Sequence, residues 1–193
     1  MFWWKAVTVL HLLDVILGYI LGGYLLKQNE CMYSHAAMEL NVRNMNVIVA
    51  IITQTTYFYH TDKMYTTTFG RNHFKSLRAS FILAQPALFV FDVQNYQLIH
   101  LLLATVVLCG TIFIATYHVF VLDPMIQNPC WVSVHFRKFF VSIGYFYCMM
   151  FVLSYMFDVV WIACAGQWFF LTLCPFVEYS YTTFGDKNLS KLT

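Results

Sequence analysis

Charged side chains are the scarcest feature of this sequence. Only 10% of its 193 residues are Asp, Glu, Lys or Arg, whereas soluble domains carry about 25%. Hydrophobic residues make up 60%, and the mean hydropathy is +0.64. The net charge is only +2, so no strongly basic body indicates a nucleic-acid partner. We therefore expect an integral membrane protein that is surrounded by lipids and binds no nucleic acid.

The sequence also lacks the common signatures of catalysis and metal binding. It contains no Gly-x-Ser-x-Gly elbow, phosphate-binding loop, His-Glu-x-x-His or glycine-rich dinucleotide turn. Its six cysteines are scattered, without a Cys-x-x-Cys pair, so neither a disulfide framework nor a zinc site is indicated. We therefore expect a protein that is not an enzyme and has no metal site.

Long apolar runs predict several membrane-spanning helices of about 20 residues each. The strongest runs are 6–26, 98–122 and 139–177, and weaker ones are 45–60 and 79–93. The run 139–177 is long enough for two crossings. Ala165-Gly166-Gln167 is the preferred break because glycine can end a helix, and a break near Asp158 is the alternative. The chain is thus predicted to be one all-α, polytopic bundle over 1–193, with spans at 6–26, 45–60, 79–93, 98–122, 139–163 and 168–182.

The basic residues support six helices over a four-helix alternative, in which 45–60 and 79–93 are re-entrant or buried. With six spans, both termini lie on the inner side, and the outer loops keep only Lys27 and Arg43. This is the bias that the positive-inside rule describes. The remaining basic residues fall on the inner side, in loops or at helix ends: Lys5, Lys63, Arg71, Lys75, Arg78, Arg137, Lys138, Lys187 and Lys191.

The first predicted helix carries one stripe of small and polar residues: Thr8, His11, Asp14, Gly18 and Gly22. Helical spacing places them on one face, which is unfavourable against lipid because a carboxylate at mid-membrane costs at least about 2.5–3.5 kcal/mol. The favoured interpretation is a helix-packing interface, since Gly-x-x-x-Gly lets two helices approach closely. The alternative is a proton relay, an ion site or a cofactor ligand.

Histidines in two of the predicted spans are candidate ligands of a haem. His100 and His118 lie on one face of the 98–122 helix, about 27 Å apart, which places His118 towards the inner side. His11 is also expected near the inner side. His11 and His118 are therefore candidate ligands of one haem b, each giving a nitrogen to the iron.

The stretch Ser133-Val-His135-Phe-Arg137 resembles, over five residues, the Ser/His/Arg quinone-side element of succinate dehydrogenase membrane anchors. The resemblance implies that Ser133, His135 and Arg137 contact a quinone or lipid head group. In that family the His and Arg are adjacent and an Asp-Tyr pair accompanies them. Here they are separated and no Asp-Tyr pair occurs, so the chain is not assigned to the family.

Three functions follow from these features. The leading hypothesis is a non-catalytic subunit of a larger membrane complex, such as an energy-converting, respiratory-type assembly, with other transmembrane subunits as partners. The alternative is a redox anchor that binds haem b or a quinone. The third is a small transporter or proton pathway through Asp14 and Gln85. The mitochondrial inner membrane and the endoplasmic reticulum are both plausible locations.

Overall fold

All the secondary structure in the described residues is helical. The computed structural model describes residues 2–92, 95–125, 131–157 and 160–188, apart from 26–39. The all-α class predicted from the sequence is therefore confirmed for this part of the chain. Its long helices are α1 (Phe2–Leu25), α3 (Leu40–Phe69), α4 (Lys75–Val90), α5 (Gln97–Tyr117), α6 (Trp131–Met156) and α7 (Val160–Asn188).

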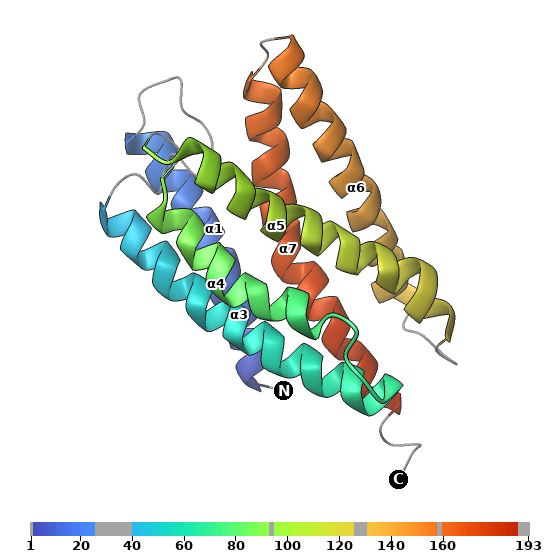
Figure 1. The fold of residues 1–193 in the computed structure, drawn as a ribbon. Helices are drawn as coiled ribbons and strands as arrows, with labels where there is room; N and C mark the ends of the chain where they lie inside the picture. The colour runs from blue at the N-terminus through green and yellow to red at the C-terminus, as the bar shows by residue number, and fades with distance from the viewer. Residues whose placement is uncertain (1, 26–39, 93–94, 126–130, 158–159, 189–193) are drawn as a thin grey trace.

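Long helices that follow one another along the chain run in opposite directions (Figure 1). α3 packs mainly on α4, and α6 packs mainly on α7. α1 lies against α3 and α7, while α5 crosses the bundle and touches α4 and α6. α1 begins and α7 ends at the same end of the bundle (Figure 1). We call this the terminal end.

The boundary between α6 and α7 corrects one sequence prediction. The preferred break at Ala165-Gly166-Gln167 is wrong, because α7 runs through these residues without interruption. α6 ends at Met156 and α7 begins at Val160, so the break falls at the alternative position; Asp158 itself lies outside the described residues. Gly166 serves helix packing, since a Cβ added there would lie 2.7 Å from a ring carbon of Tyr147 on α6.

The other helices extend around the apolar runs from which they were predicted. The run 98–122 corresponds to α5 plus the short helix that continues it, and 79–93 overlaps α4. α3 extends beyond 45–60 at both ends, through polar residues that look unsuited to a span; of these, Thr61 is buried while Asn44 and Lys63 are exposed. α3 ends just before Gly70, whose φ of +73° places it in the left-handed region that commonly terminates helices.

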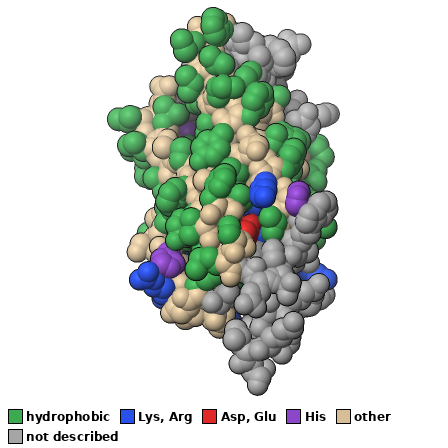
Figure 2. Space-filling view, turned by 90° about the vertical axis from the view of Figure 1, so that its right-hand side faces the viewer, with side chains coloured by type: hydrophobic (Ala, Val, Ile, Leu, Met, Phe, Trp, Pro, Cys, Tyr) green, Lys and Arg blue, Asp and Glu red, His purple; other side chains and the backbone are tan. Residues whose placement is uncertain are grey.

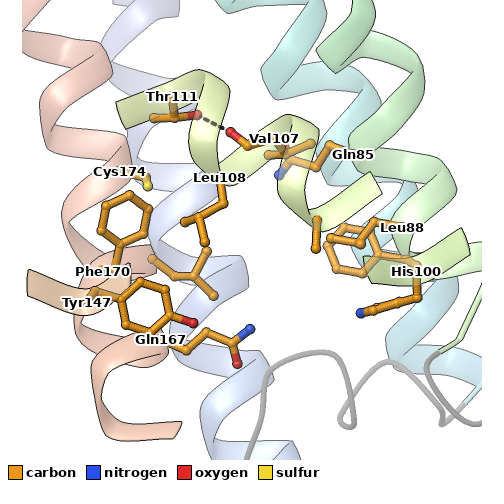
Figure 3. A pocket seen from close by; sticks show the side chains of 13 residues that line it. Gln85, Leu88, His100, Val107, Leu108, Thr111, Tyr147, Gln167, Phe170 and Cys174 are labelled. Carbon is orange, nitrogen blue, oxygen red and sulfur yellow. Dashed lines mark hydrogen bonds between the residues drawn. The ribbon is translucent and has the colours of Figure 1, made fainter. Parts of the chain in front are cut away.

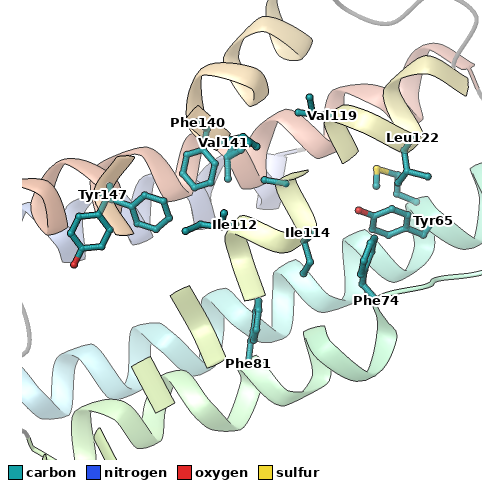
Figure 4. Close-up of a cluster of buried hydrophobic side chains, with 14 residues drawn as sticks. Tyr65, Phe74, Phe81, Ile112, Ile114, Val119, Leu122, Phe140, Val141 and Tyr147 are labelled. Atoms are coloured by element: carbon teal, nitrogen blue, oxygen red, sulfur yellow. The ribbon is translucent and has the colours of Figure 1, made fainter. Parts of the chain in front are cut away.

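A core of large side chains fills the space between α3, α4, α5, α6 and α7 (Figure 4). Several of its members are almost completely buried, and aromatic rings dominate it. The rings of Phe140 and Phe170 lie 4.9 Å apart between α6 and α7, and Tyr147 stacks on Phe170 at 5.7 Å. Such contacts add about 0.5–1.5 kcal/mol each beyond the burial of their apolar area.

The outer surface is unusually apolar. In Figure 2 the visible face is mostly hydrophobic, and its few charged side chains lie at or below mid-height. Exposed residues include Leu83 (76%), Leu98 (72%) and Phe120 (69%). Among the described residues, two helical segments are long and apolar enough to cross a membrane, Gln97–Met125 and Val132–Leu153. Only 28% of the most apolar window of each is buried, unlike the core helix of a soluble protein.

Candidate functional site

The interior contains charged side chains where a soluble bundle would hold apolar ones. Arg78, Asp123, Arg137 and Glu178 are each at most 5% exposed, and His118 lies among them at 1%. We call these five residues the buried charge cluster. With a neutral histidine it contains two positive and two negative groups. Its charges therefore balance, which matters because the desolvation of each ion costs several kcal/mol.

Arg137 is the best-anchored member of this cluster. Its Nη2 donates to Asp123 Oδ1 at 2.8 Å, and its Nε donates to Asp123 Oδ2 at 3.2 Å. The Nη1 group donates to the backbone carbonyl and the hydroxyl of Ser180, at 3.1 and 3.2 Å. This is the two-pronged geometry that a planar guanidinium offers a carboxylate. Arg137 thereby joins α6 to α7 and to the segment after α5.

A local change of helix type positions Asp123. After Tyr117 the chain forms a π-helix, η1 (His118–Leu122), and then a 3-10 turn, η2 (Asp123–Met125). The Asp123 N–H donates to the carbonyl of His118, five residues earlier, as a π turn requires. Pro124 has no N–H to continue the helix. This wider turn ends the helix with Asp123 facing Arg137, and π turns are frequent at functional sites.

His118 lies between the two ion pairs. Its Nδ1 is 3.7 Å from Asp123 Oδ1, and both arginines are close enough to act on its charge. Its ring packs against that of Tyr65 on α3, with centroids 5.3 Å apart. His118 therefore links the end of α5 to α3 as well as to the carboxylate.

The second ion pair joins helices that are far apart in sequence. Arg78 Nη1 donates to Glu178 Oε1, linking the start of α4 to α7. The guanidinium carbon of Arg78 also lies 5.9 Å from the centre of the Phe81 ring, within range of a cation–π contact. The sequence analysis placed both arginines among the basic residues of the inner side, in loops or at helix ends. In the structure Arg78 and Arg137 lie in the first two turns of α4 and α6, and both are buried inside the bundle.

His11 and Asp14 of the α1 stripe face α3. His11 Nδ1 lies 3.0 Å from the hydroxyl of Tyr57 on α3. With the Asn46 amide oriented so that its nitrogen donates, that nitrogen lies 3.0 Å from Asp14 Oδ1. His11 and Asp14 are 6% and 5% exposed. His11 and Asp14 thus contact α3 of the same bundle, and the use of the whole stripe as a helix-packing interface stays a prediction.

The remaining members of the stripe are placed in part. Thr8 is buried beside the side chain of Tyr57, next to His11. Gly18 and Gly22 lie farther along α1, and their surroundings fall outside the described part of the structure. The same α3 surface continues with Gln54, whose amide donates to Gln85 on α4.

The predicted haem ligands face different positions of α3. His11 contacts Tyr57 and His118 contacts Tyr65, and these tyrosines are eight residues, or about 12 Å, apart along one helix. Each imidazole thus contacts a different tyrosine, and the ligation of one haem by both histidines stays a prediction. In the described residues, no three His, Cys, Asp or Glu side chains are grouped so that they could hold a metal ion.

The three residues of the quinone-like stretch do not lie on one surface. Ser133 and Arg137 are four residues apart on α6, so both point into the bundle and are buried. His135 lies two residues from each, which turns it to the opposite, exposed face. Arg137 is already bonded to Asp123 and Ser180.

Sequence reasoning missed the acidic half of the cluster. Asp123 and Glu178 looked like residues at helix boundaries, where carboxylates are ordinarily solvated. The available signal was the order Asp123-Pro124 after a long apolar run, and a glutamate still within the last helix, where an unpaired charge is unfavourable. Comparisons with protein-family models, curated proteins and solved structures return no match for this chain.

Proposed function

We propose that this chain is an integral membrane protein with six membrane-crossing helices, and that it serves as a non-catalytic subunit of a larger membrane complex. One observation carries the proposal, the inverted distribution of side chains. Paired charges such as Arg137, 0% exposed, lie inside, while Leu83 and Leu98 lie more than 70% exposed outside. In water this arrangement is unfavourable because apolar side chains stay exposed to solvent. Lipid instead favours an apolar exterior with polar groups paired internally.

The use of the charged groups supports a structural role. Each acidic residue of the buried charge cluster is bonded to an arginine on another element, and Arg137 also holds Ser180. Catalytic groups instead need contact with a substrate. The cluster is therefore best explained as a connection between α4, α6, α7 and the end of α5.

The loosely packed side of the bundle supports partner subunits. Gln97–Met125 and Val132–Leu153 are only 28% buried in their most apolar windows, so most of their surface needs a cover. Helices of neighbouring subunits and lipid would share it. His11 and Asp14 of the α1 stripe already contact α3, so we propose partner contacts on α5 and α6.

Native-gel mass after mild-detergent extraction from the chain's own membrane tests this function. We expect resistance to extraction by alkaline carbonate, followed by migration in an assembly much larger than the 22.6 kDa chain. The co-migrating proteins would distinguish an energy-converting assembly of the mitochondrial inner membrane from a complex of the endoplasmic reticulum. Release by carbonate would contradict membrane integration, and migration as a single chain or small oligomer would contradict the subunit role.

A further inference from the structure

A cavity distinct from the buried charge cluster lies between α4, α5, α6 and α7 (Figure 3). Its volume is about 100 Å³, several times the space that one water molecule needs. Its wall on α5 is a single helical stripe that runs from His100 to Thr111, a length of roughly 16 Å. The cavity is therefore elongated along α5.

Most of the lining is apolar or aromatic. Leu88 and Phe89 contribute from α4, Leu108 from α5, and Phe170 from α7. Two of the polar groups are already bonded within the protein: Thr111 donates to the carbonyl of Val107, and Gln85 accepts from Gln54. Such a cavity accepts a lipophilic molecule whose polar part is small.

His100 provides the polar end of the cavity. It is 95% buried, since only 5% of it is exposed, and its Nδ1 lies 2.9 Å from the carbonyl oxygen of Phe91. A carbonyl only accepts hydrogen bonds, so Nδ1 carries the proton, and Nε2 of the neutral ring is an acceptor. No hydrogen bond to Nε2 is found among the described residues. In Figure 3 His100 and Gln167 extend into the same end of the cavity from opposite sides.

We propose that this cavity binds a lipophilic alcohol or phenol, with its hydroxyl donating to Nε2 of His100 and its apolar body lying along Leu108 and Phe170. The hydroxyl supplies the donor that a buried acceptor needs, and the aromatic walls suit a flat ring. Quinols and sterols share this chemistry. The proposal uses the membrane location only as the source of the ligand, because the binding test uses the purified chain.

Binding of tritiated probes to the full chain in lipid nanodiscs tests the site. The probes are a hydroquinone with a short isoprenoid tail, its oxidised quinone, and cholesterol. The oxidised quinone has no ring hydroxyl, so a quinol site binds it about tenfold more weakly than the hydroquinone, as expected for one lost hydrogen bond. A sterol site binds cholesterol but neither the hydroquinone nor the quinone. Either result supports the hydroxyl-binding site and identifies its source.

Three variants locate the bound probe. His100→Phe removes the acceptor and is expected to weaken binding about tenfold. Leu108→Trp fills the cavity without altering His100 and should abolish binding. Leu102 is 60% exposed on the same helix. Leu102→Trp is therefore the matched control and should leave probe binding unchanged. The proposal is overturned if neither hydroxyl probe binds, or if binding survives both His100→Phe and Leu108→Trp. Such a failure would leave the native-gel result unaffected.

Discussion

At the scale of single residues, partner geometry decides whether a buried charge stabilises this bundle. Asp123 receives two hydrogen bonds from Arg137, which also bonds to Ser180. An ion pair with such geometry offsets the desolvation of its members, whereas the loss of one partner leaves an isolated charge in an apolar interior. Single substitutions here should therefore be much more harmful than a joint replacement.

Arg137→Leu is expected to lower the free energy of unfolding by about 3–5 kcal/mol, because Asp123 would stay buried without its main partner. Asp123→Leu should have a similar effect, and the double variant should lose clearly less than the sum. Unfolding of the purified chain in detergent micelles measures all three. Lys138→Leu, at the exposed neighbouring position, is the control and should change stability by about 0.5 kcal/mol at most. Additive losses would contradict the pairing.

The contact between α1 and α3 offers a single-atom test. Tyr57→Phe removes only the hydroxyl that lies 3.0 Å from His11 Nδ1. We expect a loss of about 1–3 kcal/mol in unfolding free energy, because a buried polar group loses its partner. Tyr59→Phe, at a 63% exposed position two residues away, should have almost no effect. Equal effects of the two substitutions would show that the hydroxyl does not stabilise this contact.

At the scale of helices, the sequence predicted elements better than their ends. The run 98–122 matches α5 and η1 closely because its apolar residues are continuous. α3 was predicted too short because charged residues such as Arg43, Asp62 and Lys63 lie just outside the apolar run 45–60, yet the helix continues through them. Hydropathy measures how apolar a segment is and not where its helix ends, so it shortens helices whose end turns are polar.

Two glycines show why helix ends are hard to predict from sequence. Gly70 ends α3, through its positive φ, while Gly166, at the predicted break, lies inside α7. The two roles, a left-handed terminus and a close helix contact, favour the same residue, and only the neighbouring helix distinguishes them. The charge cluster was equally hidden, since Arg78 and Glu178 are 100 positions apart.

Gly166→Ala tests the close contact between α6 and α7. The added Cβ would lie 2.7 Å from Cδ2 of the buried Tyr147 ring, so the helices or the ring must shift. We expect a loss of about 1–3 kcal/mol in the free energy of unfolding, in the range of core overpacking. Tyr147→Leu in the same chain should make the alanine less harmful. Ala165→Leu, at the adjacent exposed position, is the matched control. A neutral Gly166→Ala variant would contradict this packing.

At the scale of the whole molecule, charged side chains lie inside the bundle and apolar side chains lie on its surface. The buried charges lie towards the terminal end, where Arg78 is in the first turn of α4 and Glu178 precedes the end of α7. The outward faces of α5 and α6 are mostly apolar, as Leu98 and Val152 illustrate, although His135 and Lys138 are exposed near the start of α6. Charge inside and hydrocarbon outside form a consistent arrangement only if the surroundings are themselves apolar. A charged substitution on this surface therefore tests whether lipid surrounds it.

Val106→Asp places a charge near the middle of α5, where the valine is 41% exposed. If lipid covers this face, the substitution costs about 2.5–3.5 kcal/mol and should sharply reduce the carbonate-resistant fraction of the expressed chain. Ser76→Asp, at an exposed position in the first turn of α4, is the control and should integrate like the unmodified protein. On a water-exposed surface such changes usually remain within about 0.5 kcal/mol. Equal integration of the two variants would therefore place the apolar face of α5 outside the lipid, against a neighbouring protein or in water.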